Sequence, residues 1–232
     1  MDNKKRLPIG YSNFKEVIEK DLYYVDKTKV IEELLDNKNK VILFPRPRRF
    51  GKTLLMSMLD NFFNIEYIKE NKNLFKNLYI SNSPYYNELS KYPVIFLSFK
   101  GITGNSYEEV YEKIQKLISD LYNKKYYLLD NLLENEQKLF KDILNRDASK
   151  ADIENSLKDL SYYLYKYYNK EVIILIDEYD VPIQDGYLKG YYDEVVTLIK
   201  NIFSSALKGN MNIKFAIMTG VLRVSRESIF SD

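Results

Sequence analysis

Gly51, Lys52 and Thr53 follow a short apolar run, and this order is typical of a loop that binds phosphate. Backbone amides at the start of a helix, together with the helix dipole, bind polyphosphate. The glycine permits a close backbone approach, the lysine places a cation at the β- and γ-phosphates, and the threonine hydroxyl can take one position around Mg²⁺. The common pattern has glycine where Arg46 stands, and Pro47 removes one amide donor. A basic, solvated turn before a helix explains the same residues equally well.

Two acids, Asp177 and Glu178, close the unbroken aliphatic run 172–176. A carboxylate at the end of a parallel strand can hold Mg²⁺ through its water shell, and a second acid suits a general base that polarises an attacking water. We expect this strand to neighbour the strand 41–44 that leads into the glycine-lysine-threonine loop. An aspartate that caps a turn is the alternative interpretation, but the combination with the loop favours nucleotide binding.

A third polar position, Thr219, ends the apolar run 213–218. A side chain at this tip, beside the acidic strand, is placed to sense a γ-phosphate or to orient a water. Arg223, and less favourably Arg226, could reach the phosphates as an arginine finger within the subunit or from a neighbour. A threonine that caps the turn and two solvated arginines are an equally weighted alternative.

The elements that must position these residues follow an α/β pattern, because short buried runs alternate with long amphipathic stretches. This pattern predicts a P-loop NTPase fold with a mainly parallel sheet flanked by helices and a helical insertion between the second and third strands. We expect strands at 41–44, 94–99, 172–176 and 213–218, and helices at 52–63, 107–121, 132–144, 153–168 and 195–206. No linker-like segment interrupts the chain, so we expect one domain over 1–232 with its core at 8–232.

The composition limits the chemistry further. The 232 residues include no His and no Cys, which excludes disulfides, the usual zinc sites, a cysteine nucleophile and a Ser-His-Asp triad. A hydrophobic fraction of 45% with 29% charged residues is ordinary for a globular protein. The apolar runs are too short to span a bilayer and no secretory signal is evident, so we expect a cytoplasmic protein without a membrane partner.

Five segments together carry a family resemblance: Leu7–Gly10, Tyr24–Thr28, Arg46–Thr53, Ile176–Asp180 and Thr219–Ser231. They resemble the AAA-ATPase-like family of bacterial proteins, which are predicted P-loop ATPases. Arginine at the unusual loop position is typical of this family. Its members commonly continue into a restriction-endonuclease-like domain of the PD-(D/E)XK type, so the resemblance implies that the C-terminal part of the family architecture is absent here.

The resemblance implies ATP and Mg²⁺ as cofactors and maps the loop and the acidic pair onto the family's site. The predicted catalytic residues are Glu178, Lys52 and Arg223, and the predicted metal ligands are Thr53 and Asp177. The predicted nucleotide-binding residues are Arg46, Arg48, Arg49, Phe50, Gly51, Lys52, Thr53, Leu54 and Thr219. The segment Tyr24–Thr28 suits a contact with adenine or a brace for the loop, although core packing is the favoured role for Tyr23 and Tyr24.

We therefore expect Mg²⁺-dependent ATP binding and ATP hydrolysis. A nucleotide-gated switch with little turnover is one alternative. Another is a component of nucleic acid processing or defence, in which Arg46, Arg48 and Arg49 meet DNA phosphates, but the net charge of +2 does not favour it. A homo-oligomer is a further candidate assembly.

Overall fold

The computed structural model describes residues 5–69 and 71–221, and it divides the chain into two compact units. The first unit holds the described residues up to Asn39 together with Pro47–Val94. The second holds Lys40–Arg46 and the described residues from Ile95 onward. The single domain expected over 1–232 stays a prediction.

The second unit is built on a four-stranded sheet. Its strands are β1 (Val41–Pro45), β2 (Val94–Ser98, of which Val94 belongs to the first unit), β3 (Val172–Asp177) and β4 (Ile213–Gly220). Their spatial order is β1-β4-β3-β2, and both β1 and β3 run parallel to β4. The predicted α/β fold with a mainly parallel sheet is confirmed. All residues of β3 are buried, as its continuous aliphatic run predicts.

The prediction that the acidic strand, β3, lies next to β1 is wrong, because β4 lies between them. Ala216 in β4 aligns with Val41 on one side and with Ile174 on the other. A central strand must satisfy backbone groups on both of its edges, and the long apolar run of β4 suits that position. Thr219, as expected, ends a strand directly beside the acidic one.

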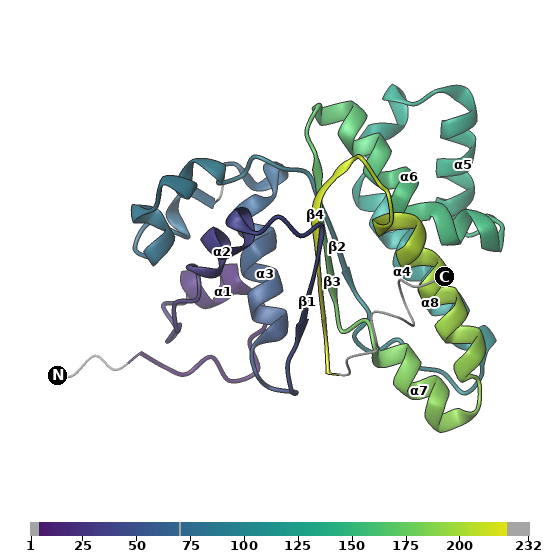
Figure 1. Cartoon of the computed structure of the whole chain (residues 1–232), viewed down its shortest axis with the longest axis horizontal. Coiled ribbons are helices and arrows are strands. Elements are labelled where there is room, and N and C mark those ends of the chain that lie inside the picture. The colour runs from purple at the N-terminus through teal and green to yellow at the C-terminus, as the bar shows by residue number, and fades with distance from the viewer. Residues whose placement is uncertain (1–4, 70, 222–232) are drawn as a thin grey trace. The chain divides into compact units, whose positions relative to one another are not determined.

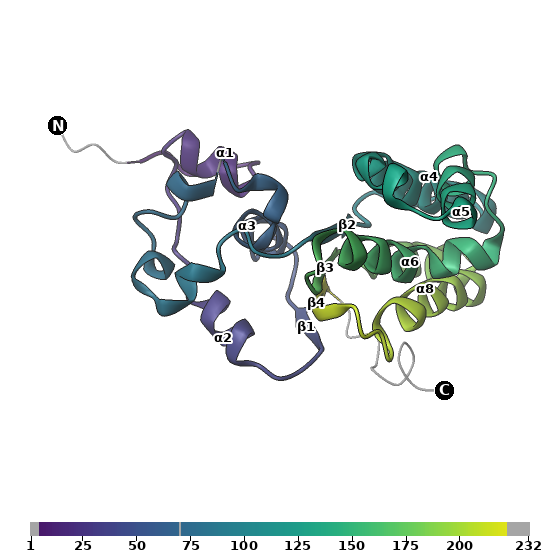
Figure 2. The same ribbon diagram turned by 90° about the horizontal axis from the view of Figure 1, so that it is seen from above.

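Helices cover one face of this sheet (Figures 1 and 2), and most of them come from the predicted insertion between β2 and β3. The helices of this unit are α4 (Tyr107–Lys124), α5 (Glu134–Asn145), α6 (Lys150–Tyr168), α7 (Val181–Lys189) and α8 (Tyr192–Leu207). A 3₁₀ helix, η5 (Tyr126–Asn131), joins α4 and α5. Buried residues of these helices and of β2, β3 and β4 form one continuous hydrophobic core.

The first unit consists of short helices around an aromatic core. Its elements are α1 (Phe14–Glu19), α2 (Val30–Asp36), α3 (Lys52–Phe63) and the 3₁₀ helices η1 (Ile65–Tyr67), η2 (Asn71–Asn73), η3 (Tyr79–Asn82) and η4 (Pro84–Glu88). Phe14 in α1 stacks on Phe75 with ring centroids 5.0 Å apart, and Phe62 in α3 meets Phe75 edge-on at 5.2 Å. The sequence pattern predicted α3 with these bounds and none of the other elements.

None of the helices in the described part of the chain combines the length and the apolar character that a membrane span requires.

Candidate nucleotide site

The helix α3 begins at Lys52, directly after the glycine of the predicted phosphate loop. Gly51 is its N-cap residue and has φ +75°, a left-handed conformation in which a side chain is strained. As a glycine, Gly51 offers no side chain to cap this helix end, and the first turn of α3 contains no acid. The first amide groups of α3, which have no partner within the helix, are therefore suited to bind an anion.

The predicted lysine folds back across its own loop. Lys52 is 8% exposed, and its Nζ donates a hydrogen bond to the carbonyl oxygen of Pro47 at 3.0 Å. Thr53 and Leu54 are half-buried in the first turn of α3. This hydrogen bond closes residues 47–52 into a ring, with the ammonium group held over the loop.

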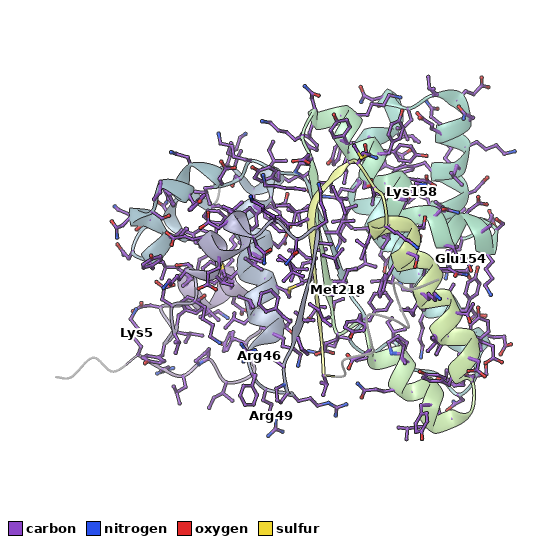
Figure 3. All side chains as sticks on the ribbon, in the orientation of Figure 1. Lys5, Arg46, Arg49, Glu154, Lys158 and Met218 are labelled. Atoms are coloured by element: carbon purple, nitrogen blue, oxygen red, sulfur yellow. The ribbon has the colours of Figure 1, made fainter. Side chains whose placement is uncertain are left out.

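The remaining loop side chains predicted to bind nucleotide are exposed. Arg46 follows β1 and is labelled in Figure 3. Its backbone N donates a hydrogen bond to the carbonyl oxygen of Gly220 at 3.0 Å. Arg48, Arg49 and Phe50 lie in the loop of the first unit, where Arg49 has a left-handed φ of 68°. A left-handed arginine costs backbone strain, and such residues cluster at ligand-binding loops.

The carboxylate of Asp177 is fully buried at the end of β3. Thr219 Oγ1 donates a short hydrogen bond to Asp177 Oδ1, so the tips of β3 and β4 are joined through their side chains. The second oxygen, Oδ2, is buried and has no hydrogen-bond partner among the described residues. Leaving a buried charged acceptor unpaired is costly, which suggests that this oxygen serves a ligand.

Mg²⁺ fits this arrangement. It keeps several water ligands and uses one or two protein groups together with substrate phosphates, so the one unpaired oxygen of Asp177 can serve it. Within residues 5–69 and 71–221 no cluster of three or more Asp or Glu side chains could enclose a metal ion. The unpaired oxygen of Asp177 is thus suited to a metal that arrives with a polyphosphate. Thr53 lies in the other unit, so its role as a ligand of that metal stays a prediction.

Glu178 occupies the turn that follows β3. It is half-buried and has a left-handed φ of 54°, unusual for a residue with a side chain. The turn is held by Thr219, whose carbonyl oxygen accepts from the backbone N of Tyr179 at 3.2 Å. Non-glycine residues in this conformation are enriched at functional sites. The catalytic role expected of this glutamate stays a prediction.

Asp180 is a part of this site that the sequence reasoning missed. Its Oδ2 accepts hydrogen bonds from Val221 N at 2.8 Å and from Gln184 Nε2 at 2.6 Å. A Cβ atom at Gly220 would lie 2.7 Å from Asp180 Oδ1, so only glycine allows this close approach. Asp180 therefore clamps the end of β4 against the turn after β3. The sequence signal for this contact is Gly220, directly after Thr219, because a residue without a side chain lets the Asp180 carboxylate approach closely.

The structure brings Asp177, Glu178 and Thr219 together in the second unit. It places Gly51, Lys52 and Thr53 together in the first. The convergence of the two groups on one nucleotide stays a prediction, because they belong to different units. The arginine-finger candidates, Arg223 and Arg226, lie outside the described residues.

A parallel sheet in the order β1-β4-β3-β2, a glycine-lysine-threonine helix start after β1 and a buried acid closing β3 define a P-loop NTPase-like protein. The family model for predicted AAA-ATPases matches residues 8–230. The chain belongs to this AAA-ATPase-like family.

A relative from Azotobacter chroococcum mcd 1, named as an uncharacterized protein in the vnfD 5′ region, is 28% identical over 231 residues. The match covers 99% of this chain and 40% of the relative, so the chain spans about two fifths of that protein's length. No solved structure matches the chain.

Proposed function

We propose that this chain binds ATP together with Mg²⁺ and hydrolyses it. The observation that carries the proposal is the start of α3, where a left-handed Gly51 precedes Lys52, no N-cap side chain is present and the first turn contains no acid. Membership of the AAA-ATPase-like family supports ATP as the ligand. The unpaired, buried Oδ2 of Asp177 supports a metal ion as a companion of the nucleotide.

Each residue has a distinct part in this proposal. The amides after Gly51 and the ammonium of Lys52 bind the phosphates and offset the charge that develops as the γ-phosphate is transferred. Thr53 and Asp177 would hold Mg²⁺, which screens the phosphate oxygens when bound. Glu178 orients the attacking water and takes its proton. Thr219 fixes the Asp177 carboxylate through its hydroxyl.

Isothermal titration calorimetry with Mg·ATP tests the binding step. We expect Lys52→Ala to weaken ATP binding by about a hundredfold, because a partly buried ammonium that contacts phosphate makes strong, charge-assisted hydrogen bonds. The matched control is Lys76→Ala, since Lys76 is an exposed lysine of the same unit. Equal affinities for wild type and Lys52→Ala would contradict the assigned phosphate loop.

Phosphate release under saturating Mg·ATP tests the hydrolysis step. We expect Glu178→Gln to retain ATP binding and to lose turnover, because the amide cannot accept the proton of the attacking water. Loss of binding in this variant would show that Glu178 is structural or binds the metal. A wild-type chain that binds ATP without releasing phosphate would support the nucleotide-gated switch instead.

A further inference from the structure

The segment Tyr24–Thr28 is a turn that its own side chains hold rigid. Asp26 Oδ1 accepts hydrogen bonds from the backbone N of Thr28 at 2.8 Å and from Thr28 Oγ1 at 2.7 Å. Tyr24, just before this turn, packs edge-on against Phe14 with ring centroids 5.3 Å apart. Burial raises the pKa of the Tyr24 hydroxyl. Tyr24 is half-buried and packs against the aromatic core, as expected. Tyr23, for which packing was also expected, is 50% exposed.

The same turn is anchored to the start of η3. Asp26 Oδ2 accepts from the backbone N of Tyr79 at 2.6 Å, and Thr28 Oγ1 accepts from the backbone N of Ile80 at 3.1 Å. The residue that precedes η3, Leu78, makes no side-chain cap, so Asp26 and Thr28 supply the missing acceptors. Thr28 is fully buried. Side chains on both sides of Lys27 are thus fixed to the body of the first unit.

Lys27, between these two anchors, extends toward the phosphate loop. Its Nζ lies 3.4 Å from the position that a Cβ atom would have at Gly51, so the ammonium lies beside the glycine that caps α3. The side chain is exposed, and no acid among the described residues forms an ion pair with it. Its charge adds to that of Lys52 and to the positive end of α3. These positive groups favour the binding of an anion beside Gly51.

We propose that Lys27 is a second cation of the polyphosphate site and that Asp26 and Thr28 position it. This inference rests on the proposed binding of ATP and assigns a role to the motif Tyr24–Thr28. A phosphate bound by the amides that follow Gly51 is within reach of an ammonium beside that residue. Lys27 contacts the phosphates, whereas Asp26 and Thr28 act through Lys27 and do not touch the nucleotide.

Calorimetric titrations with Mg·ATP, AMP and inorganic tripolyphosphate test the contact. We expect Lys27→Met to weaken the binding of ATP and of tripolyphosphate about tenfold and to change AMP binding far less, because the lost interaction is with the phosphate chain. Lys27→Arg retains the charge and is expected to keep most of the affinity. Lys29→Met is the matched control, since Lys29 is an exposed lysine just past the turn, and we expect wild-type affinities for it.

The result for Lys27→Met separates this inference from the proposed function. If Lys27→Met binds ATP as wild type does while Lys52→Ala loses binding, the role of Lys27 is wrong and the proposed function stands. If Lys27→Met weakens the binding of AMP as much as the binding of ATP, the side chain does not contact the β- and γ-phosphates, and the inference is overturned. A wild-type chain that binds neither ATP nor tripolyphosphate would overturn both.

Thr28 tests the positioning role. Thr28→Val removes the hydroxyl that accepts from Ile80 and donates to Asp26, and we expect a severalfold loss of ATP affinity. Thr28→Ser keeps the hydroxyl and is expected to restore affinity. In the Lys27→Met background Thr28→Val should have no further effect on ATP binding, because the cation it positions is gone. An equal effect in both backgrounds, or a Thr28→Ser variant as weak as Thr28→Val, would overturn the positioning role.

Discussion

Replacing Asp177 by asparagine should separate stability from ligand binding. The asparagine Oδ1 can still accept the hydrogen bond from Thr219 Oγ1, so that contact is retained. The unpaired Oδ2 is replaced by a neutral amide nitrogen, which also lacks a partner but carries no charge. We therefore expect Asp177→Asn to stabilise the protein when no nucleotide is bound, although it damages the proposed metal site.

The size of this effect follows from the burial of the carboxylate, which is 0% exposed. An unpaired buried polar group costs about 1–3 kcal/mol, and a charged group costs more than a neutral one. Replacing the unpaired carboxylate oxygen by an unpaired neutral amide should raise the free energy of unfolding by about 1 kcal/mol. For a chain of this size, that corresponds to a rise of about 2–4 °C in the apparent Tm. Mg·ATP at a hundredfold excess over its Kd should add about 2.7 kcal/mol to the free energy of unfolding of the wild type. Asp177→Asn should lose most of that increment.

Thermal unfolding with and without Mg·ATP measures both effects, and Asp180→Asn is the matched control. Asp180 Oδ2 accepts two hydrogen bonds, from Val221 and from Gln184. Loss of their charge-assisted character should cost about 2 kcal/mol and lower the apparent Tm by about 4–8 °C. A fall of several degrees for Asp177→Asn without nucleotide would refute the reasoning, because it would show that Oδ2 makes stabilising contacts.

Two further substitutions test the packing around the second unit's loops. Gly220→Ala should destabilise the protein by about 1–3 kcal/mol in urea unfolding, because its Cβ would lie 2.7 Å from Asp180 Oδ1. An unchanged urea midpoint would show that the Asp180 side chain can move aside without loss of stability. Burial raises the pKa of Asp185, but hydrogen bonds from Tyr191 and Lys189 are among the contacts that outweigh it, so the pKa is lowered. Asp185→Asn should therefore be less stable than wild type at neutral pH, and the difference should shrink as the pH falls below about 4, through the lowered pKa. A difference that does not depend on pH would contradict the charge-assisted contacts.

The elements with regular apolar periodicity were predictable from the sequence. The strand runs and α3, with bounds at residues 52 and 63, appear as expected because their apolar residues follow the period of a strand or a helix. The six residues of α1 and the seven of α2 are too short to show that period. The helix α7 was missed because Pro182 and Gly186 resemble turn signals, although a proline in the first helical turn lacks only an amide that needs no helical partner.

Contacts between distant segments were the part that the sequence could not show. The lateral order of parallel strands leaves no trace in their apolar runs, so the position of β4 between β1 and β3 was missed. Lys27 and Gly51 lie in two loops that come close together, and no periodicity connects them. The pairing of Thr219 with Asp177 was accessible because both residues end strands expected to be adjacent.

The central place of β4 has a consequence for how the chain folds during synthesis. β4 follows β1, β2 and β3 in the sequence, yet it fills the gap between β1 and β3. The facing edges of these two strands can pair in their native order only after residues 213–220 have left the ribosome. Unpaired strand edges invite association with other chains. The nascent protein therefore passes through a long stage in which a chaperone that shields strand edges would raise the yield of folded protein.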